Sequence, residues 1–256
     1  MNCKIIKIAK GVISFLIVIL IMSCGTDEEV SLDDVVNEIT DDQTTDDQTT
    51  DNPPSGEVVK YLALGDSYTI GQGVVAQDRW PIQLKSALEK LNYTIEVVDI
   101  IAQTGWTTNN LLKAIENRKP EGYNLISLLI GVNNQFQNQS FNTFKVEFEL
   151  LLDKSIEIAG DAHNVFVVSI PDYGVTSFGV TNSNAIGQEI DLYNEYIADQ
   201  CSEKKISFID ITRISRELAD SDGALVEDGL HPSGSQYLEW TNKILPAVKE
   251  ILDNSK

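Results

Sequence analysis

The sequence predicts an α/β fold, a three-layer α/β/α sandwich in which a five-stranded parallel sheet lies between two layers of helices. Five short apolar segments are rich in strand-forming residues, and segments with apolar residues at helical spacing separate them. Strands that alternate with helices in this way build a parallel sheet covered on both faces. The alternation runs through residues 58–256, where we find no internal repeat and no second domain.

The predicted strands are bounded by glycine, proline and polar residues. They cover residues 58–64, 94–101, 123–130, 165–170 and 206–211. The third segment is almost wholly apolar, which is typical of a strand buried on both faces. The first runs into a turn that contains Gly65 and Ser67, and the third ends at Gly131.

The first three predicted helices follow the first three strands. Pro81 opens a helix that reaches about Leu91, because proline suits a first helical position. A short helix around Leu111 follows the second strand. Ser140 is the expected N-cap of a long third helix that closes at Gly160.

Two further helices complete the pattern. Apolar residues recur at helical spacing over 186–201, which places Cys201 in the core. Ser233 and Gln236 have the spacing of a capping box and open the last helix. We expect a kink in that helix at Pro246.

The N-terminal segment has the features of a secretion signal. Lys4, Lys7 and Lys10 precede an apolar run over 11–22, which is too short for a comfortable membrane span. The sequence up to Cys24 resembles the lipobox of bacterial lipoproteins, which implies cleavage of residues 1–23 and lipidation of Cys24. The alternative is a plain signal peptide or signal anchor with an incidental cysteine.

Residues 24–57 separate this signal from the predicted domain. From residue 25 onward they hold twelve acidic residues and no basic ones, and they repeat Asp-Asp-Gln-Thr-Thr at 41–45 and 46–50. Such a segment buries too little apolar surface to offset its chain entropy, so we expect a disordered acidic tether. The expected location is a bacterial lipoprotein anchored in a membrane, at the outer membrane, facing the periplasm or the surface.

Charge and composition exclude several classes of protein. Without the acidic tether and the three lysines of the signal, residues 58–256 carry a net charge of −11. No basic stripe could neutralise phosphates, so nucleic acid is not an expected partner. The chain has two histidines, which argues against a His-rich metal site, and we expect no cofactor. With Cys3 cleaved away and Cys24 lipidated, Cys201 has no disulfide partner.

A serine and a histidine stand where a parallel sheet binds its ligands. Ser67 lies just past the carboxyl end of the first strand. His163 belongs to a polar turn before the fourth strand, at the opposite end of the sheet. His231 lies in the loop ahead of the last helix, and Pro232 disfavours helical dihedrals there. Asp228, three residues earlier, can hold one nitrogen of the His231 ring.

Four short blocks of sequence carry a family resemblance. They are Gly65-Asp66-Ser67-Tyr68, Gly105, Gly131-Val132-Asn133 and Asp228-Gly229-Leu230-His231. In this order they resemble the motif blocks of the SGNH, or GDSL-type, hydrolase family, over essentially all of 58–256. Because the serine turn is not a Gly-x-Ser-x-Gly elbow, we expect a flavodoxin-like layout with strand order 2-1-3-4-5.

The resemblance implies a role for five residues. Ser67 would be the nucleophile, His231 the base and Asp228 the residue that orients it. The backbone N–H groups of Ser67 and Gly105 and the side-chain amide of Asn133 would stabilise the oxyanion.

The sequence departs from the family pattern at two positions. Tyr68 replaces the usual leucine, at a position whose side chain need not touch the reacting carbonyl. Asn134 stands where the family commonly has aspartate, which leaves open how that loop is held. Asp66 is expected to hydrogen-bond its own turn rather than to take part in catalysis.

The function expected from these residues is a serine ester hydrolase that acts on short acyl or O-acetyl esters, small or glycan-bound. Lysophospholipase or thioesterase activity, and a surface carbohydrate- or lipid-binding lipoprotein without turnover, stay open as alternatives. Substrate preference is expected to depend on loops 132–140 and 171–184. Trp106 and Tyr173 flank the predicted mouth, where they contact substrate or merely pack. The sequence indicates no oligomeric state.

Overall fold

The computed structural model describes residues 58–218 and 220–254. The chain divides into two compact units, and these residues belong to the second, Thr50–Lys256. The predicted signal peptide, Cys24 and the acidic tether lie outside the described residues. Within the described part, no helix combines the length and the hydrophobicity that a membrane span requires.

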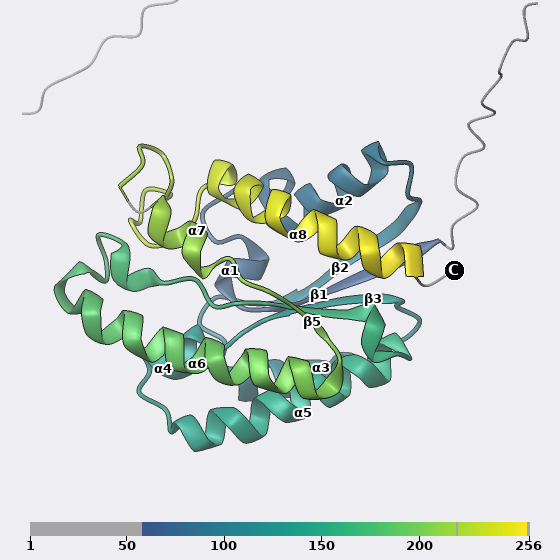
Figure 1. Ribbon diagram of the computed structural model, residues 1–256, viewed down its shortest axis with the longest axis horizontal. Helices are drawn as coiled ribbons and strands as arrows, with labels where there is room; N and C mark the ends of the chain where they lie inside the picture. Colours follow the sequence, from purple (N-terminus) through teal and green to yellow (C-terminus); the bar gives the residue numbers. More distant parts are fainter. Residues whose placement is uncertain (1–57, 219, 255–256) are drawn as a thin grey trace, which may run out of the picture. The chain divides into compact units, whose positions relative to one another are not determined.

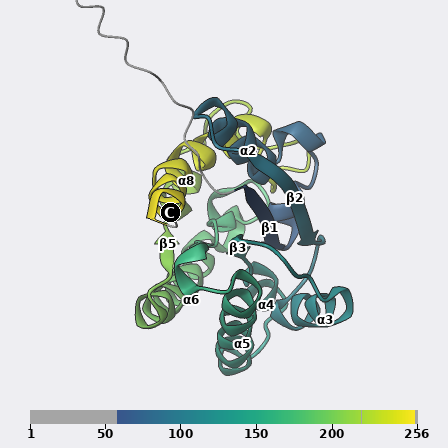
Figure 2. The ribbon, with the colours of Figure 1, turned by 90° about the vertical axis from the view of Figure 1, so that its right-hand side faces the viewer.

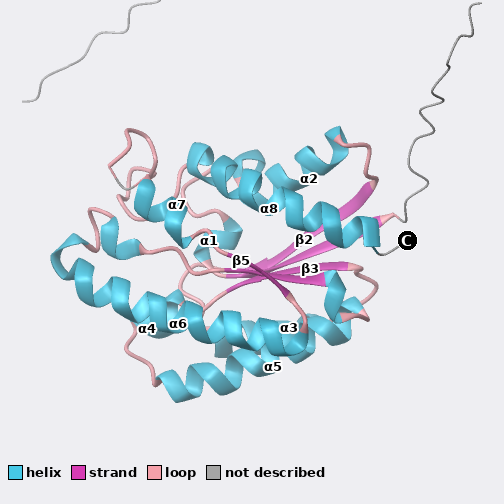
Figure 3. Cartoon of the chain, viewed as in Figure 1, coloured by secondary structure: helices cyan, strands magenta, loops and turns pink. Residues whose placement is uncertain are grey.

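The sheet has five parallel strands in the order β2-β1-β3-β4-β5, as predicted. In Figure 3 the strands, drawn in magenta, lie between the helices. The strands are β1 (Val59–Gly65), β2 (Ile95–Ala102), β3 (Leu125–Leu129), β4 (Val165–Val168) and β5 (Ser207–Ile209). β1 pairs with both β2 and β3 and is therefore an interior strand, β3 is the middle strand of the sheet, and every residue of β3 is buried. Burial on both faces explains the continuous apolar run of β3.

Helices cover both faces of the sheet, which confirms the three-layer sandwich (Figure 1). On one face lie α2 (Trp80–Lys90) and α8 (Gly234–Asn254), which pack against each other. The other face carries α3 (Thr108–Arg118), α5 (Phe141–Ala159) and α6 (Ser183–Lys204). Figure 2 shows the two helical layers on opposite sides of the strands.

Three short helices were not predicted. They are α1 (Ser67–Ile70), α4 (Val132–Phe136) and α7 (Thr212–Glu217), and they follow β1, β3 and β5. Short 3₁₀ turns add η1 (Ala76–Asp78), η2 (Ala162–Asn164), η3 (Tyr173–Val175) and η4 (Val180–Asn182). Segments this short cannot display a helical repeat of apolar residues, so periodicity does not reveal them.

The ends of the long helices agree with the sequence in part. Gly160 closes α5 with a φ of 75°, as expected of a C-cap. Ser140 occupies the N-cap of α5 but makes no side-chain capping hydrogen bond. The Ser233 hydroxyl accepts the N–H of Gln236 at 3.4 Å, which is one half of the expected capping box. Pro246 lies inside α8, which continues to Asn254.

The core lies between the sheet and both helical layers. Its largest fully buried side chains include Trp80, Trp240, Phe144 and Phe148. Cys201 is also fully buried, which confirms its assignment to the core, and burial raises the pKa of its thiol to about 12. Each fully buried large apolar side chain contributes about 1.5–3 kcal/mol to stability. The carboxyl ends of β1 and β3 are thereby held firmly, and the short helices α1 and α4 follow them.

Candidate active site

The turn after β1 presents Ser67 at the start of α1. A Cβ at Gly65 would lie 2.1 Å from the Thr69 hydroxyl oxygen and 2.5 Å from the Leu129 carbonyl oxygen, so only glycine fits. Asp66 caps α1, and its Oδ1 accepts the N–H of Tyr68 at 3.0 Å. This bond confirms the structural role expected of Asp66.

The carboxylate of Asp228 makes three contacts with the loop that carries His231. Its Oδ2 lies 2.7 Å from Nδ1 of His231, and its Oδ1 accepts the backbone N–H groups of Leu230 and His231, both at 2.9 Å. Partial burial works to raise the pKa of Asp228, but the hydrogen bonds from His231 and Leu230 hold it below its ordinary value. The carboxylate therefore stays ionised at neutral pH, and with the ring proton on Nδ1, Nε2 is left as an acceptor.

Four of the five predicted site residues line one cavity of about 240 Å³. They are Ser67, Gly105, Asn133 and His231, and the other lining residues are Tyr68, Thr104, Val132, Phe136, Tyr173, Phe178 and Leu230. Asp228 does not line the cavity but is bonded to His231. No hydrogen bond joins Ser67 to His231, a separation that is common before substrate binds. The structure thus gathers residues that follow β1, β2, β3 and β4, together with the loop before α8, around one space.

Gly105 lies in the loop after β2, and Asn133 lies in α4, which follows β3. Gly105 has a φ of 83°, a left-handed conformation that other residues adopt only at a cost. Asn133 donates one amide N–H to the Trp106 carbonyl oxygen at 3.0 Å. A side-chain amide has two such donors, so the second remains available for a ligand.

Asn134 links α4 to α3 from a fully buried position. Its Oδ1 accepts the N–H of Thr108 at 3.0 Å, and its amide nitrogen donates to the hydroxyl of Thr108 at 2.7 Å and to Oε1 of Gln139 at 3.1 Å. Both halves of the amide are used. This arrangement needs a donor as well as an acceptor, which an ionised aspartate would not supply.

The two aromatic residues expected at the mouth differ in position. Tyr173 lines the cavity, and its hydroxyl donates to Oε1 of Gln135 at 2.8 Å. Trp106 is not among the lining residues; its side chain packs against the hydrophobic core. The carbonyl of Trp106, rather than its ring, serves the site through Asn133.

Three aromatic residues of the site were missed or undervalued. Tyr68 lines the cavity with its ring centroid 5.6 Å from that of His231, a position that the sequence did not predict. Phe136 and Phe178 also line the cavity, and their sequence pattern did not predict this. Each is an isolated aromatic residue in a polar stretch of sequence, which is the one signal that could have indicated a place in the site.

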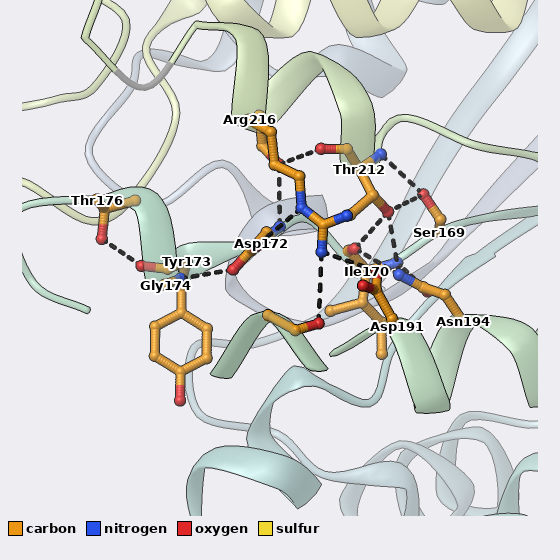
Figure 4. Close-up of polar contacts among 12 residues, drawn as sticks. Ser169, Ile170, Asp172, Tyr173, Gly174, Thr176, Asp191, Asn194, Thr212 and Arg216 are labelled. Carbon is orange, nitrogen blue, oxygen red and sulfur yellow. Dashed lines mark hydrogen bonds and ion pairs between the residues drawn. The ribbon is translucent and has the colours of Figure 1, made fainter. Parts of the chain in front are cut away.

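A polar network holds the loop that carries Tyr173 (Figure 4). The buried carboxylate of Asp172 accepts the N–H of Gly174 and Nε of Arg216, both at 2.8 Å. Arg216, on α7, also donates to Asp191 on α6 at 2.7 Å. In Figure 4 the Tyr173 ring extends away from this network. The ion pairs thus fix the backbone on one side while the ring contributes to the cavity.

The described residues contain no group of three or more histidine, cysteine, aspartate or glutamate side chains that could hold a metal ion. His163 is exposed, and its Nδ1 lies 2.9 Å from Oδ1 of Asp161. It takes no part in the cavity around Ser67.

Fold and site together define a parallel α/β protein that carries a serine and an aspartate–histidine pair at the carboxyl ends of its strands. Residues 63–237 match the model of the GDSL-like lipase/acylhydrolase family. The chain belongs to that family. A search of curated proteins found no match to this chain.

Solved structures resemble this fold over nearly their whole length. An acetyl xylan esterase from Geobacillus stearothermophilus has 17% identity and a TM-score of 0.59, over 75% of this chain and 95% of the other. The lipase/acylhydrolase from Enterococcus faecalis has 20% identity and a TM-score of 0.59, over 76% and 97%. Phospholipase A1 from Streptomyces albidoflavus has 20% identity and a TM-score of 0.57, over 76% and 99%. At these identities the likeness concerns the fold.

Proposed function

We propose that this chain is a serine ester hydrolase that works through an acyl-enzyme intermediate. The observation that carries the proposal is the cavity that Ser67 and His231 both line. Outside this cavity, the carboxylate of Asp228 is hydrogen-bonded to Nδ1 of His231. A nucleophile, a base and a group that orients the base are the parts that acyl transfer requires.

In the first half of the reaction, the Ser67 hydroxyl attacks the ester carbonyl and His231 Nε2 takes its proton. Negative charge develops on the carbonyl oxygen, where the N–H groups of Ser67 and Gly105 and the free amide proton of Asn133 stabilise it. The intermediate collapses when the bond to the alcohol oxygen breaks. His231 then donates the proton to the leaving alcohol.

Water completes the cycle. His231 removes a proton from water, the resulting nucleophile attacks the acyl group on Ser67, and the carboxylic acid leaves as Ser67 regains its proton. Asp228 remains ionised and stabilises the protonated ring in both halves.

The proposed substrates are carboxylic esters with short acyl or O-acetyl groups. The small cavity, with Val132, Tyr173 and Leu230 among its lining, supports this proposal because it offers an apolar space for such a group. One similar structure is an acetyl xylan esterase and another a phospholipase A1, so lysophospholipid and thioester hydrolysis are the alternatives.

Turnover of p-nitrophenyl acetate and labelling by a fluorophosphonate probe test the proposal together. We expect Ser67→Ala to abolish both while the protein stays folded. Ser86→Ala, at an exposed serine on α2, is the matched control and should keep both. Undiminished labelling of the Ser67→Ala variant would reject the nucleophile. A wild-type protein that stays unlabelled and inactive would favour the binding-protein alternative.

We also propose that lipidated Cys24 anchors the protein to a membrane, as its lipobox-like sequence suggests. Growth with labelled palmitate should mark the protein, and Cys24→Ser should move it from the membrane fraction to the soluble one. Equal labelling of the variant would contradict the anchor.

A further inference from the structure

A second cleft of about 340 Å³ adjoins the cavity around Ser67. The two spaces share the side chains of Phe136, Tyr173 and Phe178. These residues come from the loops after β3 and β4, at 132–140 and 171–184. Because an ester extends in two directions from its carbonyl, a substrate held at Ser67 has one part in the cavity and another part that can reach this cleft.

The shared residues form an aromatic wall. The ring centroids of Phe136 lie 6.1 Å from Tyr173 and 5.9 Å from Phe178. Phe136 and Phe178 are 50% and 52% exposed, whereas the other phenylalanines among the described residues are buried or partly buried. Exposed aromatic faces gathered at one site mark a surface that binds an apolar face of a ligand.

The cleft is also lined by polar residues with unused hydrogen-bonding groups. The side chains of Asn138, Thr181 and Asn182 line it and make no hydrogen bond with other described residues. Gln135, by contrast, is already bonded to the hydroxyl of Tyr173, and its amide donates to Glu189 at 2.7 Å. The cleft therefore pairs aromatic faces with free amide and hydroxyl groups.

The charges around the cleft limit what it can bind. Among the described residues, no lysine or arginine lines either space. Arg216 is committed to Asp172 and Asp191. Of the acidic residues in the described part of the chain, Glu189 alone lines the cleft. Phosphate groups are usually held by arginine or lysine, so a phosphorylated alcohol does not suit this site.

The loop that carries Tyr173 and Phe178 is fixed before any ligand arrives. Asp172 and Arg216 hold its start (Figure 4), and the Ser177 hydroxyl donates to the Gly229 carbonyl oxygen at 3.0 Å. Gly229 belongs to the same turn as Asp228 and His231. A wall attached to that turn keeps a constant position relative to Ser67, which lowers the ordering cost of binding.

We infer that this cleft binds the alcohol part of the substrate ester, and that this part is a neutral polyhydroxy group such as a sugar ring. The inference rests on the proposed ester hydrolysis at Ser67. The apolar C–H face of the ring lies on Phe136 and Phe178, and its hydroxyl groups exchange hydrogen bonds with Asn138, Thr181 and Asn182. The short acyl group occupies the cavity on the other side of the scissile bond.

The test compares acetylated xylotriose with p-nitrophenyl acetate as substrates of the full-length chain. Ala185→Trp fills the cleft from an exposed position on α6, and Asn182→Ala removes one amide. Asn182 makes no side-chain capping bond, so its loss leaves α6 intact. We expect the ratio of kcat/KM for the sugar ester to that for p-nitrophenyl acetate to fall tenfold or more in Ala185→Trp and about threefold to tenfold in Asn182→Ala. The matched control, Leu192→Trp, lies on exposed α6 surface outside the cleft and should keep the wild-type ratio.

A binding measurement separates this inference from the proposed function. Calorimetric titration of the Ser67→Ala variant with acetylated xylotriose should show binding that Ala185→Trp weakens tenfold or more. If wild type hydrolyses p-nitrophenyl acetate but acetylated xylotriose neither binds nor reacts, the inference is overturned and the hydrolase stands. If xylotriose binding persists without any turnover, the hydrolase fails and the cleft stands. Tighter binding of lysophosphatidylcholine, or equal effects of the two tryptophans, would also overturn the inference.

Discussion

One carboxylate sets both the position of His231 and the orientation of its ring: Oδ1 of Asp228 accepts the backbone N–H of His231 at 2.9 Å, and Oδ2 lies 2.7 Å from Nδ1. Gly229, with a φ of 67°, makes the tight turn that brings the two residues together. Both are therefore set within four consecutive residues, and the bond from the Ser177 hydroxyl to the Gly229 carbonyl oxygen ties this turn to the loop after β4.

Asp228→Asn should keep the turn but remove the charge that stabilises the protonated ring. An asparagine oxygen can still accept the backbone N–H groups. Its amide, however, can donate to Nδ1 and move the ring proton to Nε2, where it blocks proton transfer from Ser67. We expect kcat for p-nitrophenyl acetate to fall on the order of 10³-fold or more. Asp222→Asn, in the neighbouring exposed loop, should have no effect. Near-normal turnover by the Asp228 variant would remove this residue from the mechanism.

Gly65→Ala should destabilise the protein through a steric clash. The added methyl group would lie 2.5 Å from the Leu129 carbonyl oxygen, which belongs to β3 and cannot move freely. Overpacking of this kind costs about 1–3 kcal/mol or more of unfolding free energy. Thermal unfolding of Gly65→Ala is compared with that of Gly160→Ala, because Gly160 has a φ of 75° but open space around it. The loss of unfolding free energy should be larger in Gly65→Ala. Equal losses in the two variants would exclude the clash.

Much of the fold follows from local sequence. β3 and the stripes of α5 and α8 are long enough to show their apolar pattern, and strands alternating with helices leave few topologies to consider. The blocks around Ser67, Asn133 and His231 indicated a site because each stands at a strand's carboxyl end or in the loop before the last helix.

The rest of the site depends on contacts that sequence spacing does not encode. The contact between the tilted rings of Tyr68 and His231 joins residues that are far apart in the sequence. Phe136 and Phe178 meet only because the loops after β3 and β4 are neighbours in the sheet order. Trp106 looked equally suited to the mouth, yet its ring packs inward. Which way a loop aromatic turns is decided by its tertiary neighbours.

Asp66 should make stability depend on pH. Burial raises the pKa of its carboxyl from 3.8 to about 7, against the opposing hydrogen bond from Tyr68. The folded protein therefore binds this proton more tightly than the unfolded chain does. Its contribution is fully present below about pH 4 and is lost as pH rises towards 7.

Asp66→Asn isolates this effect because the amide oxygen can keep the bond to Tyr68 and carries no charge. Denaturant unfolding from pH 4 to pH 8 should show a difference in free energy between variant and wild type that grows with pH, by up to about 4 kcal/mol. The gain should level off above pH 7. Parallel curves over this range would mean that Asp66 is ionised in the folded state throughout.

The last prediction compares two arginines on α7. Arg216 pairs with the buried Asp172, whose side chain is 3% exposed, whereas Arg213 pairs at 3.4 Å with Glu217 and both partners are more than half exposed. Removing Arg216 leaves a buried carboxylate without its cation, which costs about 3–5 kcal/mol in comparable buried pairs, while an exposed pair contributes about 0–1 kcal/mol. Arg216 is itself one-third exposed, and solvent screening lowers the cost to the lower end of that range or slightly below it. We expect Arg216→Ala to lower the unfolding free energy by about 2–3 kcal/mol and Arg213→Ala by less than about 0.5 kcal/mol.

The same comparison shows whether the ion pair serves the site as well as the fold. Asp172 precedes Tyr173, so a loosened loop should displace the aromatic wall and raise KM more than it lowers kcat. Steady-state kinetics at a temperature where both variants remain folded measure that split. Arg216→Lys should recover part of the stability, because its ammonium can reach Asp172 but cannot also bond Asp191 in the geometry of the guanidinium. Equal kinetics in the two alanine variants would confine the role of Arg216 to stability and would leave the wall fixed by the contact between Ser177 and Gly229.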